Sequence, residues 1–187
     1  MNRKILAVLL LVVGVFALAS RLTGDAKQTG VSGFVVEHEL VLPASPEAVY
    51  DAITGDISPW WDHHFSANPK KFYIEPRPGG GFYEIFNDAG DGVLHATVIF
   101  AQRGKRLRFT GPFGFSGSGV DLVVTYDLKP EGGGTRFHLT CAVTGQVSEA
   151  GAQGVDQVWR HFLFERLKPY IESGEYKKHQ RAPGGKQ

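Results

Sequence analysis

The stretch VDQVWRHFLFERLKPYI, residues 155–171, decides the fold, because its hydrophobic residues recur every three to four positions. This period places the large apolar side chains on one face of an amphipathic α-helix of roughly twenty residues. Pro169 lacks an amide hydrogen, so we expect a kink or an end of the helix near it. A helix with one apolar face must cover another apolar layer, which the rest of the chain has to supply.

Before this helix the chain alternates apolar and polar residues in short runs, which is the pattern of β-strands. Residues 33–42 form the first run, and six more follow after Pro69, separated by glycine-rich turns such as 78–80 and 130–134. Such spacing predicts an antiparallel meander of hairpins. The six later strands are expected at residues 71–75, 81–86, 92–101, 105–110, 120–128 and 135–144.

Two short helices are expected between the first strand and the meander. The sequence Ser-Pro-Glu at 45–47 supplies an N-cap, a proline at the first helical position and an acid in the first turn, so a helix should run from 46 to about 54. Residues 56–61 predict a second helical turn, which carries Trp60 and Trp61. Both of these large aromatic side chains need cover from the rest of the fold.

These elements predict an α+β domain in which a curved antiparallel sheet of about seven strands wraps around the long C-terminal helix. The sequence also resembles a known family in several short strings that occur in order: LPASPEAVY (42–50), WW (60–61), EPRPGGGFYE (75–84), KRLRF (105–109) and GGGTR (132–136). They are similar to strings of the START-like (SRPBCC) superfamily, which has the helix-grip fold. Within it, the chain resembles the subgroup of heat-shock-protein ATPase activator homologues and polyketide cyclases, over about residues 35–172. The resemblance implies a cavity for an apolar molecule between the sheet and the long helix.

Composition limits the function classes. The 187 residues suffice for one domain, and the single cysteine, Cys141, cannot form a disulfide within the chain. The net charge is +1, without the basic stripe that a phosphate backbone demands, so a nucleic-acid partner is not expected. We expect a monomer.

The first nineteen residues are typical of an export signal. Arg3 and Lys4 precede an uncharged apolar run at 5–19, which ends in Ala-Leu-Ala at 17–19. This is the layout of a secretory signal peptide with a cleavage site after Ala19, although an uncleaved membrane anchor remains an alternative. Either outcome predicts a periplasmic or secreted domain, whose contact with the membrane is limited to an uncleaved N-terminal segment.

The rest of the chain divides into three parts. Residues 20–32 form a polar linker, residues 33–174 the START-like domain, and residues 175–187 a polar tail without a core pattern.

Glu84 is the charged residue of greatest interest. It shares a strand face with Phe82 and Phe86, so it points into the apolar interior if that face is turned inward. A buried carboxylate is costly unless it is paired or neutral. Glu84 is therefore either a polar anchor in the cavity or the partner of a basic residue such as Arg77 or Arg108.

Histidines supply the remaining candidates for chemistry. His95 lies on the next strand, where Glu84 could reach it across the hairpin, either as a pair for proton transfer or as an ordinary hydrogen bond. Asp62, His63 and His64 are the one cluster of metal-ligand type, but side chains adjacent in sequence point apart, so no metal site is expected.

The glycine-rich segment 111–119 carries Phe113 and Phe115 and cannot be a regular strand. It is either a lid over the mouth of the cavity or a plain connection whose phenylalanines pack into the core.

We therefore expect an exported domain that binds a small apolar or lipid-like ligand. The alternatives are a cyclase- or hydrolase-type enzyme that uses a cavity acid or base such as Glu84, and a protein-interaction or chaperone-activator-like module. No catalytic motif is recognisable, so no catalytic residue and no cofactor is assigned. The candidate cavity residues are Trp60, Trp61, Phe82, Glu84, Phe86, His95, Phe113, Phe115 and Trp159.

Overall fold

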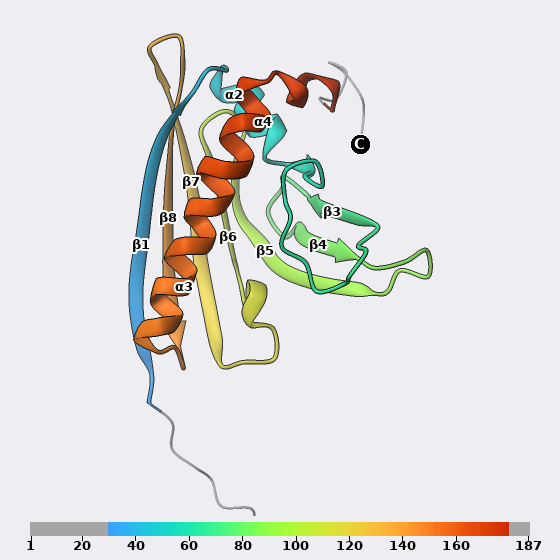
Figure 1. Cartoon of the computed structure of the whole chain (residues 1–187), viewed down its shortest axis with the longest axis vertical. Coiled ribbons are helices and arrows are strands. Elements are labelled where there is room, and N and C mark those ends of the chain that lie inside the picture. Colours follow the sequence, from blue (N-terminus) through green and yellow to red (C-terminus); the bar gives the residue numbers. More distant parts are fainter. Residues whose placement is uncertain (1–29, 180–187) are drawn as a thin grey trace, which may run out of the picture. The chain divides into compact units, whose positions relative to one another are not determined.

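A computed structural model describes residues 30–179 of the chain, and residues 31–179 fold as one unit. Strands make up most of the chain before the long helical segment, and short helices interrupt them (Figure 1). The elements are β1 (Ser32–Leu42), α2 (Pro46–Ala52), β2 (Gly55–Asp56), β3 (Lys71–Ile74), β4 (Gly81–Ile85), β5 (Gly92–Gln102), β6 (Arg106–Gly111), η1 (Phe113–Phe115), β7 (Val120–Glu131), β8 (Gly134–Gly145), α3 (Glu149–Arg160), η2 (His161–Leu167), α4 (Lys168–Glu172) and η3 (Glu175–Lys178).

All eight strands form one antiparallel sheet in the order β1-β8-β7-β6-β5-β4-β3-β2. The first strand pairs with the last, so β1 is fixed by a partner about a hundred residues away, with Val36 opposite Cys141. The register shifts at 82/83 and between Val98 and Phe100, and such bulges increase the twist and bend of a sheet. The predicted α+β helix-grip fold is confirmed, with the short β2 added to the seven expected strands.

The long helix crosses one face of the curved sheet (Figure 1). The hydroxyl of Ser148 caps its N-terminus by accepting a hydrogen bond from the amide of Gly151. The apolar face predicted from the sequence is buried, whereas Phe164 beside it is 37% exposed. The buried residues are Val155, Trp159, Phe162, Leu163, Leu167, Tyr170 and Ile171.

Pro169 does not end the helix, which continues to Glu172. The segment before the proline, η2, is a π-helix, and the amide of Lys168 bonds to the carbonyl of Leu163, five residues earlier. The wider π-helical ring shifts the hydrogen-bond register just before the residue that cannot donate. The helix therefore changes its register at the proline and does not stop there.

Only one of the two short helices expected after the first strand is present, namely α2. Gly55 and Asp56 pair with β3 instead, and the amides of Trp60 and Trp61 close a single turn on the carbonyl of Ile57. The indole of Trp60 donates to the carbonyl of Ala52, so its side chain is covered by α2.

The predicted signal or anchor segment lies outside the described residues, as do the start of the linker and the end of the polar tail. The tail begins with η3, where Tyr176 is buried. Within residues 30–179, no helix combines the length and the apolar character that crossing a bilayer requires.

The docking of the long helix gives the first prediction. Trp159→Ala removes a buried ring from the contact between helix and sheet, so the free energy of unfolding should fall by about 3–5 kcal/mol. Phe164→Ala, which removes an exposed ring from the same helix, is the control and should change it far less. Urea unfolding followed by circular dichroism measures both. Equal losses in the two variants would contradict the docking described here.

Candidate functional site

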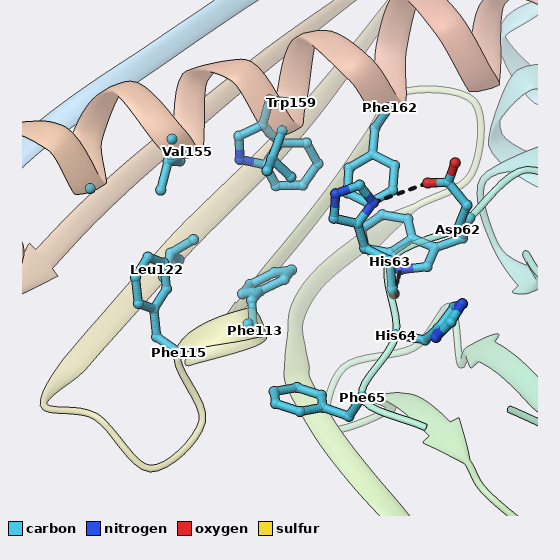
Figure 2. A pocket seen from close by; sticks show the side chains of 15 residues that line it. Asp62, His63, His64, Phe65, Phe113, Phe115, Leu122, Val155, Trp159 and Phe162 are labelled. Carbon is cyan, nitrogen blue, oxygen red and sulfur yellow. Dashed lines mark hydrogen bonds and ion pairs between the residues drawn. The ribbon is translucent and has the colours of Figure 1, made fainter. Parts of the chain in front are cut away.

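A cavity of about 710 Å³ lies between the helix α3, the turn η1 and the loop at 61–65 (Figure 2). One wall is a single face of the helix, formed by Gly151, Gly154, Val155, Val158, Trp159 and Phe162. The opposite walls are formed by Trp61, Asp62, His63, His64, Phe65, Phe113, Gly114, Phe115 and Leu122. Figure 2 shows Asp62 and His63 near Phe162, while Phe115 and Leu122 lie toward the other end. The cavity is thus apolar with a polar end.

Gly154 keeps part of the helix wall open. Gly154 lies inside α3, where a glycine destabilises the helix by about 1 kcal/mol relative to alanine. A methyl group added to Gly154 would meet no atom within 4 Å, so the space beside it is empty. The helix face that covers the sheet is therefore not filled where it borders the cavity.

Trp61 forms the floor of the cavity. Its ring stacks on Phe162 with centroids 3.8 Å apart and planes 18° apart, and it meets Phe82 edge to face at 5.0 Å. Its indole N–H donates to the carbonyl of His63, which fixes the start of the loop. Aromatic pairs of this kind add about 0.5–1.5 kcal/mol each beyond simple burial.

Phe113 belongs to the rim of the cavity and to the core at the same time. It is buried against Phe82, Phe109 and Trp159, although its φ of 48° lies in the left-handed region that non-glycine residues rarely adopt. Phe115, the other phenylalanine of η1, is only half-buried. Phe113 therefore packs into the core, as the interpretation of a plain connection expected, and both rings line the cavity.

Glu84 is fully buried and serves the loop beside the cavity. Its carboxylate accepts hydrogen bonds from the amide of Phe65 at 2.9 and 3.0 Å and from the amide of Ser66 at 2.8 Å. Neither of the basic partners considered from the sequence binds it, because Arg77 pairs with Glu75 and Arg108 donates to Thr125.

His95 is the side-chain partner of Glu84, with His95 Nε2 and Glu84 Oε2 3.1 Å apart. Burial lowers the pKa of His95, while the hydrogen bond that it donates to Glu84 and a backbone hydrogen bond to Phe113 oppose that shift. Through His95, Glu84 is therefore linked to η1 as well as to the loop at 65–66. The pair holds two walls of the cavity in place without lining it.

Four of the nine predicted residues line the cavity, namely Trp61, Phe113, Phe115 and Trp159. Trp60, Phe82, Glu84 and His95 are buried beside it, and Phe86 lies beyond the end of β4, half-buried. On the helix face, only Trp159 was predicted from the sequence, and the other lining residues were not. The signal was present, because Gly151 and Gly154 fall on the same three-and-four period as Val155, Val158, Trp159 and Phe162.

Asp62 is the centre of the polar end. Its carboxylate lies 2.9 and 3.0 Å from His161 Nε2, 3.0 Å from His63 Nδ1 and 3.1 Å from Arg166 Nε. The Nδ1 atom of His161 contacts Glu165 at 2.9 Å. His161 and Arg166 both come from the π-helical segment η2, about a hundred residues after Asp62.

These contacts shift the pKa values of the group. Partial burial alone would raise the pKa of Asp62, but hydrogen bonds from His161 and His63 lower it overall. The hydrogen bonds to Asp62 and Glu165 raise the pKa of His161. The arrangement therefore favours a charged Asp62 next to a protonated His161.

Cys141 offers no nucleophile to the cavity. It is fully buried, and burial raises the pKa of its thiol to about 11. A thiol of this kind is a small core side chain.

Comparison with known proteins gives a family profile and several similar structures. The profile of the Activator of Hsp90 ATPase homolog 1-like proteins matches residues 43–172. The Mll3558 protein from Rhizobium loti has a TM-score of 0.55 at 22% identity, over 72% of this chain and 94% of that one. A putative uncharacterized protein from Rhizobium leguminosarum has a TM-score of 0.57 at 17% identity, over 79% of this chain and 99% of that one. The Aha1 dimer from Colwellia psychrerythraea has a TM-score of 0.52 at 20% identity, over 76% of this chain and 98% of that one. Among curated proteins, no sequence matches significantly.

The Glu84 contacts give the second prediction. Glu84→Gln replaces one acceptor oxygen by a donor that faces amide and imidazole donors, so the free energy of unfolding should fall by about 1–3 kcal/mol. Glu37→Gln, at an exposed position in β1, is the matched control and should be near neutral. Urea unfolding measures both, and unchanged stability in Glu84→Gln would show that the carboxylate does not hold the loop.

Proposed function

The chain belongs to the family of Activator of Hsp90 ATPase homolog 1-like proteins, and from this premise we propose that it binds one small apolar molecule in the cavity under α3. Family membership accounts for the fold, while the function has to be argued from the site. The observation that carries the proposal is the apolar cavity itself. Its volume of about 710 Å³ falls within the range of roughly 300–1,000 Å³ that is common for small-molecule sites.

The lining supports an apolar or lipid-like ligand. Aromatic and aliphatic side chains form most of the walls, and the charged groups are confined to the end at Asp62. An apolar ligand gains affinity when the cavity removes its surface from water, at about 25 cal/mol per Å². The polar end can then orient it through one hydrogen-bonding group.

Glu84 is a weak candidate for catalysis in the alternative, enzymatic interpretation. A general acid or base must come within hydrogen-bond reach of its substrate. Glu84 is fully buried, bound to two amides and His95, and does not line the cavity. Its geometry supports a structural role.

The place of action is part of the proposal. Residues 1–19 have the charge and apolar pattern of an export signal, so the domain is proposed to bind its ligand outside the cytoplasm.

Export gives the third prediction. After expression in a bacterial host, intact-mass analysis of the recovered protein should show a chain that begins at Ser20, because cleavage is expected after Ala19. A full-length chain in the membrane fraction would indicate an anchor. A full-length chain in the cytosol would contradict export.

Ligand binding gives the fourth prediction. The folded protein should bind N-phenyl-1-naphthylamine, a neutral apolar fluorophore, in a saturable one-to-one manner. Gly154→Phe should abolish this binding, because the new ring occupies the empty space beside the helix. Gly154→Ala is the matched control, which should keep binding and raise stability by about 0.5–1 kcal/mol.

Fluorescence titration and thermal unfolding measure these effects together. Binding of the probe that is equally strong in Gly154→Phe, with the fold intact, would place the probe elsewhere and contradict the proposal. Absence of saturable binding in the unmodified protein would also contradict it.

A further inference from the structure

We propose that Asp62, His63 and His161 form a binding site for a divalent transition-metal ion of the zinc type at the polar end of the cavity. One carboxylate oxygen and two imidazole nitrogens from these residues lie within 4.8 Å of one another. Two histidines and a carboxylate are ligands that zinc uses in sites that keep a further position open. Asp62, His63 and His64 are neighbours in the chain and could not form a site by themselves, whereas the third ligand, His161, comes from the long helical segment.

Two of the three pairs of ligand atoms fit an ion with little rearrangement, and the two imidazole nitrogens lie within 4.8 Å of each other. Asp62 Oδ1 lies 3.0 Å from His63 Nδ1 and 3.0 Å from His161 Nε2. Ligand atoms at about 2.0–2.1 Å from a tetrahedral ion are separated by about 3.3 Å. The pairs that now share a hydrogen bond therefore need to separate by only a few tenths of an ångström to admit the ion.

The surrounding contacts are those that orient metal ligands. A metal-binding histidine usually donates its second ring N–H to a carboxylate, and His161 Nδ1 lies 2.9 Å from Glu165 Oε2. This contact leaves Nε2 directed at Asp62. Arg166 Nε lies 3.1 Å from Asp62 Oδ2, so Asp62 Oδ1, which also contacts His63, remains available to the ion.

The charges around the site are close to balanced. Asp62 and Glu165 are the acidic groups that face His161, and Arg166 is the basic group. Metal ligands must be deprotonated, so an ion binds in competition with the proton on His161.

The site opens to the cavity, because Asp62 and His63 both line it. Figure 2 shows these two side chains joined by a hydrogen bond at the end of the cavity next to Phe162. The π-helical segment supplies His161, and π-helical turns occur frequently at functional sites. An ion here would bind an apolar molecule that ends in a carboxylate or another oxygen donor, and this last step rests on the proposed function.

The test is a titration of the tag-free protein with Co²⁺, followed by its visible absorption, and with Zn²⁺, followed by calorimetry. We expect one ion per chain and d–d bands typical of mixed nitrogen and oxygen ligands. His161→Asn should weaken binding at least roughly tenfold, and Glu165→Gln, which removes the orienting charge, by about tenfold. His138→Asn is the matched control, since His138 lies on β8 and belongs neither to the cavity lining nor to the cluster, and it should bind as the unmodified protein does.

Thermal unfolding of each metal-free variant establishes that it is folded. Absence of one-to-one binding in the unmodified protein would overturn the proposal, as would equal affinity in a folded His161→Asn. Titration with N-phenyl-1-naphthylamine separates this proposal from the ligand-binding one. Retained probe binding without metal binding rejects the metal site alone, whereas metal binding without probe binding rejects the apolar ligand.

Discussion

The cavity depends on the hydrogen bonds that the buried carboxylate of Glu84 accepts. Between β2 and β3 the chain runs for more than ten residues without helix or strand, so neither a sheet ladder nor a helix holds the loop at 61–66. Two amides of that loop donate to Glu84, and His95 extends the same network to Phe113. A buried charge is tolerated only when its hydrogen bonds are made, so the network holds both loops in a single arrangement.

The cavity itself results from incomplete filling of the helix face. Trp159, Phe162 and the buried residues after them cover the sheet. Gly154, where the cavity begins, makes no side-chain contact and lowers the stability of the helix. The hydrogen bonds then change to the π-helical register before Pro169, which brings the side chains of η2 to the opposite end. The same helix therefore packs on the sheet, borders the empty space of the cavity at Gly154 and contributes side chains to the polar end of the cavity.

Most of the fold could be predicted from the sequence, because periodicity is a local property of the chain. The alternation of residues around Glu84 predicted that its side chain points inward, and the hairpin predicted that it lies close to His95. The amides that bind Glu84 could not be predicted, since every residue except proline carries an amide N–H and the residue type does not show which ones turn inward. The contact of Asp62 with His161 was equally hidden, because it joins two segments 99 positions apart that no pattern connects.

Burial separates the two groups of histidine and carboxylate in this protein. Glu84 and His95 are buried, and their bonds are directed at backbone and at each other, so a bound molecule finds no free lone pair there. Asp62, His63 and His161 are at least partly exposed, and their contacts are among polar side chains that can move apart by small rotations. A site that binds a ligand or an ion must exchange its own hydrogen bonds for new ones. The second group can make that exchange at the end of the cavity, while the first group keeps the walls in place.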